Sequence, residues 1–187
     1  NLIATRETSS LVNTIMPGMK SPFDLVLTDN EVKKTKSYSF ELDYKVSPPK
    51  NQAIDITESE LSRDNYNNLI ITGTVTNRGD ITANTVAVIA TLYDNEGNVA
   101  AVSRIHPEPD YLRANDYAFF VVSIPDKIQT NGINDYTLIA ESEEYAAVPE
   151  FPVGTFVLLV ATLSAYIGIT RYSGRIIPNL ISATNLR

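Results

Sequence analysis

The sequence predicts an all-β protein of tandem antiparallel β-sandwich domains, followed by a single C-terminal transmembrane α-helix. Three observations support this prediction: residues alternate with period two, part of that pattern recurs, and the charge of the chain divides at one point. Of the 187 residues, 43% are hydrophobic and 20% are charged, with a net charge of −7. This composition excludes a disordered or collagen-like chain and fits one or two small domains.

Side chains that alternate with period two define the expected strands. The clearest sets are Val86, Val88, Ala90 and Leu92, and then Ile71, Gly73, Val75 and Asn77. We expect strands near 52–58, 68–77, 84–93, 98–105, 117–124 and 135–147. Residues 77–80 and 94–97 combine Asn or Asp with Gly, which predicts a hairpin turn at each place. Short strands separated by such turns are typical of a β-sandwich.

An internal repeat indicates a second, incomplete domain. Residues 1–29 align without a gap on residues 98–126, and after one inserted residue Tyr38 aligns with Tyr136. The matched apolar positions share strand parity, and they pair Phe23, Leu25 and Leu27 with Phe120, Val122 and Ile124. In the second unit the matched stretch follows two long strands that have no equivalent before residue 1. We therefore interpret residues 1–47 as the C-terminal half of a first domain whose N-terminal half is not in this sequence.

The remaining boundaries follow from composition. Residues 48–51 contain Pro48 and Pro49 and are interpreted as a stiff linker. Residues 52–148 then form the complete sandwich domain, residues 149–175 a membrane anchor helix with its flanks, and residues 176–187 a cytoplasmic tail. Residues 1–47 are not expected to form a closed sandwich by themselves.

The charge of the chain divides at Glu150. Residues 1–150 carry 12 Lys and Arg against 22 Asp and Glu, a net −10, whereas the last 37 residues carry three Arg and no acidic residue. Residues 153–170 form an uncharged run of eighteen residues. As a helix this run spans roughly 27 Å, close to the ~30 Å hydrocarbon thickness of a bilayer. A buried core helix is the alternative, but it would normally carry a polar stripe.

Basic residues set the expected orientation of this helix. Arg171 and Arg175 follow it, and four glutamates precede it, so the C-terminus is expected in the cytoplasm and the acidic body outside. The membrane lipid is therefore one predicted partner. Small residues that would allow close packing against a neighbouring membrane subunit are Gly154, Ala161, Ser164, Ala165 and Gly168.

Two stretches resemble known families. The run from Gly73 to Ala101, with Leu92-Tyr93-Asp94 and the later Phe119-Phe120, resembles the FxLYD-type and related Ig-like domains of prokaryotic surface proteins. This resemblance implies Ig-like β-sandwiches over residues 52–147 and half a unit over residues 1–47. It does not imply a particular activity, because such domains serve as spacers and binding surfaces.

The second resemblance lies at the predicted anchor. Pro149-Glu150-Phe151, followed by an apolar helix and Arg, is similar to the PEF-type C-terminal sorting signal of archaeal surface proteins, which an archaeosortase reads. The resemblance implies an archaeal cell-surface protein. Both a retained anchor and a cleaved sorting signal fit this pattern, and we favour the retained anchor.

The sequence offers little chemistry. It has no Cys, which excludes disulfides, thiolate metal sites and cysteine nucleophiles. The one histidine, His106, lies near Glu108 and Asp110 and is a weak metal candidate, with an exposed loop histidine as the simpler interpretation. An acidic body argues against nucleic acid as a partner. We expect no catalytic residue, no cofactor and no enzymatic activity.

Three other patterns have simple structural interpretations. Glu141, Glu143 and Glu144 are expected to stay solvated in a connector before the anchor. The adhesion tripeptide Arg78-Gly79-Asp80 is expected to close a turn. Pro17-Gly18, flanked by two Met residues, is expected to form a turn capped by hydrophobic side chains and no metal site.

The predicted function is that of a non-enzymatic, membrane-anchored cell-surface protein that acts through protein–protein contacts. One form of this role is an accessory or structural subunit of an integral membrane complex, with other membrane or surface protein subunits as partners. The alternative is an extracytoplasmic substrate- or metal-binding module that serves a membrane enzyme.

Overall fold

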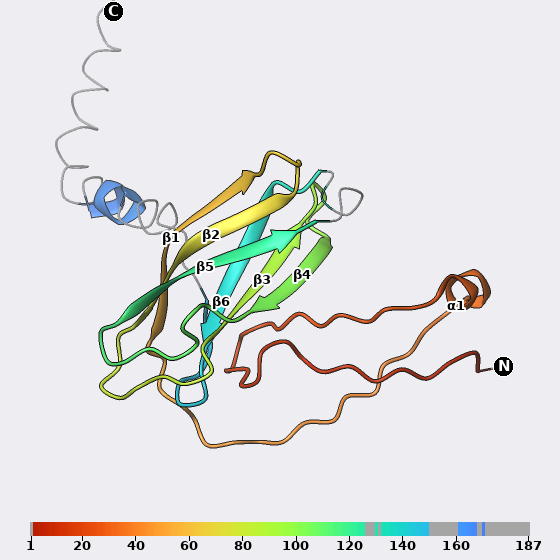
Figure 1. Cartoon of the computed structure of the whole chain (residues 1–187), viewed down its shortest axis with the longest axis horizontal. Helices are drawn as coiled ribbons and strands as arrows, with labels where there is room; N and C mark the ends of the chain where they lie inside the picture. Colours follow the sequence, from red (N-terminus) through yellow and green to blue (C-terminus); the bar gives the residue numbers. More distant parts are fainter. Residues whose placement is uncertain (1, 126–129, 131, 150–160, 168–169, 171–187) are drawn as a thin grey trace, which may run out of the picture. The chain divides into compact units, whose positions relative to one another are not determined.

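The computed structural model describes residues 2–125, 130, 132–149, 161–167 and 170. The chain divides into two compact units, Asn1–Glu150 and Phe151–Arg187. The described residues of the first unit contain a short helix and seven strands (Figure 1). These elements are α1 (Asp29–Lys34), β1 (Ile54–Arg63), β2 (Leu69–Asn77), β3 (Ala87–Tyr93), β4 (Val99–Ile105), β5 (Tyr117–Ile124), β6 (Asp135–Glu141) and β7 (Val148–Pro149).

The strands form two antiparallel sheets that enclose one core. One sheet has the order β1-β2-β5 and the other the order β4-β3-β6-β7. The chain changes sheet after β2, after β4 and after β5, so three connections cross between the layers. Figure 1 shows β2 and β5 lying across β3 and β6. The predicted mostly-β architecture with two antiparallel sheets is therefore confirmed.

Six strands lie where the alternation predicts them, with two differences. β1 continues past residue 58 because an irregularity between Thr57 and Glu60, where Glu58 adopts a φ of 59°, lets the ladder with β2 resume. β6 ends at Glu141 and not at residue 147. The chain turns there because the Ser142 hydroxyl accepts hydrogen bonds from the backbone N–H groups of residues 144 and 145.

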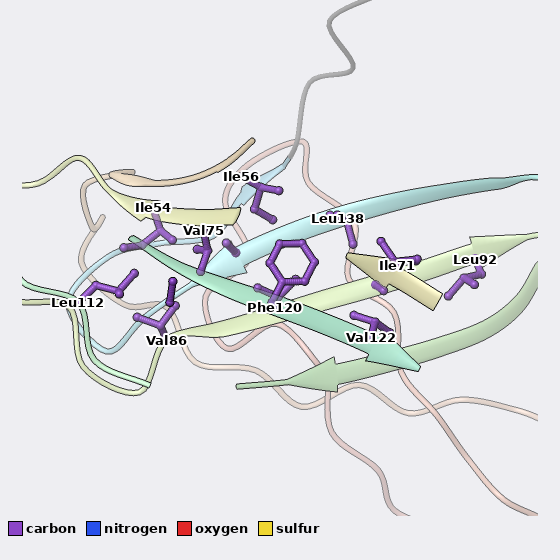
Figure 2. Packing of buried hydrophobic residues seen from close by; sticks show 14 of the residues in the cluster. Ile54, Ile56, Ile71, Val75, Val86, Leu92, Leu112, Phe120, Val122 and Leu138 are labelled. Atoms are coloured by element: carbon purple, nitrogen blue, oxygen red, sulfur yellow. The ribbon is translucent and has the colours of Figure 1, made fainter. Parts of the chain in front are cut away.

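The core lies between the two sheets and is centred on Phe120 of β5 (Figure 2). β2 contributes alternate side chains to it, and Gly73 of β2 pairs with Phe120 across the sheet. A Cβ atom on Gly73 would lie 2.6 Å from Phe120 Cζ. The glycine therefore gives the aromatic ring the room that it occupies in the core.

Two hairpins close with the same aspartate turn. In the β1–β2 turn, Asp64 Oδ1 accepts from the N–H groups of Tyr66 (2.9 Å) and Asn68 (2.8 Å). In the β3–β4 turn, Asp94 makes the matching bonds to residues 96 and 98. The bonds from the backbone and side chain of Asn98 are the main reason that the pKa of Asp94 is lowered. The hairpin predicted at residues 94–97 is confirmed, whereas the sequence prediction did not include the first one.

The hairpin predicted at residues 77–80 is wrong, because β2 and β3 belong to different sheets. Asn77 instead organises a crossing connection. Its buried side-chain amide donates to the carbonyl oxygens of Ile81 (2.8 Å) and Leu112 (2.9 Å) and accepts from the Gly79 N–H (2.8 Å). Asn77 therefore ties the β2–β3 connection to the segment that precedes β5.

Residues 2–47 contain α1 and no strand. Of the residues that the repeat aligns with β5, Phe23 forms only an isolated bridge, with Ser10. A pair of strands without a covering layer is marginally stable in water, which explains why the pattern forms no ladder here. The assignment of residues 1–47 to half of a domain stays a prediction.

The second unit is described at residues 161–167 and 170, which are helical. Within the described residues no helix has both the length and the apolar character that crossing a membrane requires. Most of the predicted span over residues 153–170 lies outside the described residues, and so does the tail at 176–187. The anchor helix stays a prediction.

Two neighbouring phenylalanines of β5 differ in burial: Phe120 is 2% exposed and Phe119 is 70% exposed. We expect Phe120→Ala to lower the free energy of unfolding by about 3–5 kcal/mol, since it leaves a cavity between the sheets. Phe119→Ala is the matched control and should change it by less than about 0.5 kcal/mol. Urea denaturation checks both, and equal losses for the two variants would contradict the orientation of β5.

Candidate functional site

A loop from the N-terminal region covers the outer face of the β4-β3-β6-β7 sheet. β3 is buried on both faces, because its residues Ala87 and Ile89 point away from the sandwich core. Val12 packs on these two residues and on Ile139 of β6, and is itself 1% exposed. Residues 10–22, called the covering loop below, therefore add a third layer to the sandwich.

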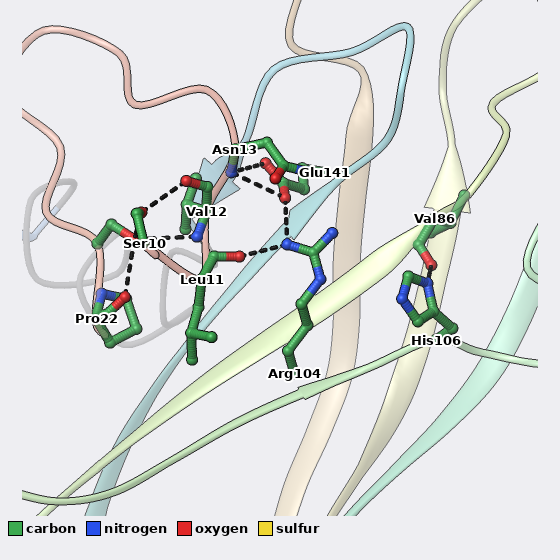
Figure 3. A network of polar contacts seen from close by, with 10 residues as sticks. Ser10, Leu11, Val12, Asn13, Pro22, Val86, Arg104, His106 and Glu141 are labelled. Carbon is green, nitrogen blue, oxygen red and sulfur yellow. Dashed lines mark hydrogen bonds and ion pairs between the residues drawn. The ribbon is translucent and has the colours of Figure 1, made fainter. Parts of the chain in front are cut away.

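An ion pair holds this loop in place (Figure 3). Arg104 of β4 and Glu141 at the end of β6 lie on the outer face, in register with Ile89 and Ala87 of the strand between them. Arg104 Nη1 lies 2.8 Å from Glu141 Oε1, and the Glu141 side chain is only 2% exposed. The same Nη1 atom donates a hydrogen bond to the Leu11 carbonyl oxygen. The guanidinium thus binds the sheet and the loop together.

The carboxylate of Glu141 is satisfied from the loop side as well. The backbone N–H of Asn13 donates to Oε1 at 3.1 Å and to Oε2 at 2.9 Å. A buried carboxylate is costly unless it is paired and hydrogen-bonded, and both conditions hold here. No buried side-chain nitrogen or oxygen in the described part of the chain lacks a hydrogen-bond partner. We call Arg104, Glu141 and their bonds to Leu11 and Asn13 the clasp.

The covering loop is shaped by its own hydrogen bonds. The Leu11 N–H donates to the Pro22 carbonyl oxygen at 2.9 Å, and the Val12 N–H donates to Ser21 Oγ at 3.0 Å. The predicted Pro17-Gly18 turn is present: the Met19 N–H donates to the Met16 carbonyl oxygen, and Gly18 has a φ of 84°. These hydrogen bonds therefore close the loop at its base and form the turn at its tip.

The clasp corrects one expectation from the sequence. Glu141 was expected to stay solvated with its neighbours, and that expectation is wrong. The strand pattern offered one signal, since Glu141 has the same parity as Ile139 in β6 and so points to the outer face. The partner residues lie 37 and 128 positions away in the sequence, and no local pattern connects them.

His106, the weak metal candidate, lies in the loop after β4 and is exposed. Its Nδ1 atom lies 2.7 Å from the Val86 carbonyl oxygen, which fixes Nδ1 as the protonated nitrogen (Figure 3). Among the described residues, no three His, Asp or Glu side chains gather in a group that could hold a metal ion. The geometry around His106 supports a loop contact and supplies at most one ligand.

Two neighbouring glutamates hold the β2–β3 connection. Glu144 accepts hydrogen bonds from the backbone N–H and the side-chain amide of Asn84, each at 2.7 Å. Burial acts to raise the pKa of Glu144, but these bonds and one from Ser142 outweigh it, and the pKa is lowered. Glu143 accepts a hydrogen bond from the Thr85 hydroxyl at 2.9 Å. Both side chains therefore act as structural acceptors.

The adhesion tripeptide is packed into the same connection. A Cβ atom on Gly79 would lie 1.9 Å from Tyr145 Oη, so no larger residue fits there without displacing the ring. The Tyr145 hydroxyl also donates to Asp80 at 3.5 Å, and Arg78 lies 3.5 Å from Asp55. Contacts within the sandwich account for this tripeptide.

The residues predicted for the anchor fall largely outside the described residues. Pro149 lies in β7 and pairs with Ile139, so the first residue of the predicted sorting motif belongs to the sheet. Ala161 and Ala165 lie one helical turn apart in the described helical stretch. Six residues predicted for the anchor lie outside the described residues: Glu150, Phe151, Gly154, Gly168, Arg171 and Arg175.

Exposed apolar side chains occur on the outer face of β5, which is an edge strand of its sheet. Tyr117, Phe119 and Val121 are each more than half exposed, and the first two rings pack edge to face with centroids 6.1 Å apart. Apolar stripes of this kind on soluble domains often mark contacts with other proteins. The outer face of β5 is therefore a candidate interaction surface.

Comparison of the chain with protein-family models, with curated proteins and with solved structures gave no match in any of the three.

The clasp predicts a matched pair of arginine effects. Arg104→Ala leaves the Glu141 carboxylate buried without its counter-charge. We therefore expect the free energy of unfolding to decrease by an amount at the lower end of ~3–5 kcal/mol. The covering loop should then be cut by trypsin at Lys20 much faster than in the unaltered protein. Arg113→Ala removes an exposed arginine and should change neither quantity. Equal proteolysis rates for the two variants would contradict the clasp.

The lowered pKa of Glu144 predicts a pH effect on stability. The folded state holds this carboxylate ionised, so its contribution is complete above the usual glutamate pKa of ~4.3 and is lost as pH falls through the lowered folded value. Glu144→Gln should reduce stability at neutral pH and flatten the loss of stability below about pH 4. Urea midpoints measured against pH test this, with Glu143→Gln as the charge-matched control. An unchanged pH slope in Glu144→Gln would refute the assignment.

Proposed function

We propose that the chain is a membrane-anchored cell-surface protein that acts through protein–protein contacts and not as an enzyme. In this role it serves as an accessory or structural subunit of an integral membrane complex. The observation that carries the proposal is the exposure of the apolar helical stretch over residues 161–167, where Leu163, Tyr166 and Ile167 are each more than half exposed. Side chains of this size and polarity favour a lipid or protein environment over water.

The charge pattern supports an outward-facing sandwich. All acidic residues lie at or before Glu150, and Arg171 and Arg175 follow the apolar run, which favours a cytoplasmic C-terminus. The order of the two sheets fits the Ig-like sandwich that the FxLYD resemblance implies, and such sandwiches serve as spacers and binding surfaces. Pro149, Glu150 and Phe151 would then mark the boundary between the surface domain and its anchor.

Contacts with other subunits have two candidate surfaces. One is the exposed face of β5, formed by Tyr117, Phe119 and Val121. The other is the small-residue face of the anchor, where Ala161 and Ala165 lie one turn apart and Gly154 and Gly168 continue the pattern in the sequence. Small residues let neighbouring membrane helices approach closely.

A second candidate function is an extracytoplasmic substrate- or metal-binding module that serves a membrane enzyme. The contact between His106 Nδ1 and the Val86 carbonyl oxygen favours it, because metal-binding histidines commonly donate one ring N–H to such a carbonyl and coordinate through the other nitrogen. Metal analysis of the purified protein separates the two functions. Stoichiometric metal that is lost in His106→Ala would favour this second function over the first.

The anchor is tested on the full chain in the cells that make it. We expect the protein to remain with the membrane pellet after alkaline carbonate extraction, and a variant that lacks residues 153–170 to be soluble. A variant in which the order of residues 153–170 is shuffled keeps the hydropathy and should stay in the pellet. Release of the unaltered protein by carbonate would overturn the anchor, and release of the shuffled variant alone would show that protein packing and not lipid retains it.

A further inference from the structure

Two segments of the N-terminal region have the pattern of sandwich strands but no layer to cover them. In residues 38–46, every second side chain is apolar, and these side chains are between 67% and 92% exposed. They are Tyr38, Phe40, Leu42, Tyr44 and Val46. A shorter run has apolar side chains at Phe23, Leu25 and Leu27, which are all exposed, although Val26 on the opposite side is apolar and exposed as well. A strict period of two over this length is the mark of a strand with one buried face.

The complete sandwich shows what covers the equivalent residues. In the internal repeat, Phe23, Leu25 and Leu27 align with alternate residues of β5 that are 2%, 0% and 8% exposed. The register that pairs Tyr38 with Tyr136 also pairs Phe40 with Leu138 and Leu42 with Ala140, both fully buried in β6. In that domain the covering residues come from β1, β2 and β3 (Figure 2).

The two exposed segments contact each other through aromatic side chains. The rings of Phe23 and Phe40 pack edge to face with centroids 5.7 Å apart, and Tyr38 packs on Phe40 at 5.3 Å. Their counterparts Phe120 and Leu138 come from opposite sheets and belong to the same core cluster (Figure 2). Phe23 and Phe40 therefore correspond to two residues that share one sandwich core.

We propose that residues 23–27 and 38–46 are a docking surface for β-strands of a polypeptide outside these 187 residues, which complete a second sandwich. The partner has the chemistry of β1–β3: three strands with alternating Ile, Leu and Val side chains on one face. Strand addition of this kind gives affinity through main-chain hydrogen bonds and specificity through alternate side chains.

The chemistry of the segment disfavours other occupants. Lipid would have to accept Glu41, Asp43 and Lys45, which alternate with the apolar residues. A second copy of this chain would have to supply β1–β3, and these strands are already paired within its own sandwich. The inference depends on the sandwich and the repeat and not on the membrane anchor.

These 187 residues contain no cysteine, so single cysteine substitutions within them allow a direct test. Phe40→Cys and Leu42→Cys lie on the apolar face, and Glu41→Cys and Asp43→Cys are their matched controls on the polar face. In the purified 187-residue chain, a maleimide should label all four at similar rates. In the cells that make the full protein, positions 40 and 42 should react at least about tenfold more slowly than positions 41 and 43. Equal rates in cells, or protection of all four together, would overturn the proposal.

The identity of the occupant is tested by a photo-crosslinking amino acid at Phe40 in the same cells. We expect crosslinks to peptides that lie outside residues 1–187 and have alternating apolar residues. Crosslinks to residues 1–187 of a second copy, or to lipid alone, would overturn the proposal. The same residue at Leu42 repeats the test in case the change at Phe40 disturbs the surface.

Discussion

The structure depends on covering both faces of the central strand β3. One face of this strand meets the β1-β2-β5 sheet in a core centred on Phe120, and the other would expose Ala87 and Ile89 to water. Val12 of the covering loop shields Ala87 and Ile89 from water, and the clasp of Arg104 and Glu141 holds the loop in place. The ion pair lies beside the apolar face of β3, where it binds the backbone of the covering loop. Residues 10–22 of the N-terminal region are thus a layer of the sandwich.

The same constraint explains where the chain presents apolar surface. Three sets of apolar side chains have no cover within the described residues: the outer face of β5, the alternating segment at 38–46, and the helical stretch at 161–167. Each has a different geometry, namely a sheet face, a strand with one apolar side, and a helix. We propose a polypeptide with β-strands as the partner of the second set and lipid as the environment of the third.

The sequence predicted the sandwich well and its polar contacts poorly. Alternation located β1, β2 and β5 because each of these strands buries alternate side chains. Gly97 located the β3–β4 turn because that position needs a positive φ. Residues 23–27, whose apolar positions match the parity of β5, form no strand, since a local pattern cannot tell whether a covering layer is present. Glu141 was misjudged for a related reason: its partners Arg104 and Asn13 are distant in sequence, and only the folded sheet brings them together. Asn77 likewise resembled a hairpin residue, although its side chain binds the carbonyl oxygen of Leu112, which lies 35 positions away in the sequence.

The central claim is that the covering loop is a fixed layer on β3. The most direct measurement is the nuclear Overhauser effect between the methyl groups of Val12 and those of Ile89 and Ile139 in the full chain. The structure predicts strong effects to both isoleucines, because the three side chains share one buried cluster. Absence of these effects, while those between β3 and β6 persist, would show that the loop does not cover the sheet and would contradict the account.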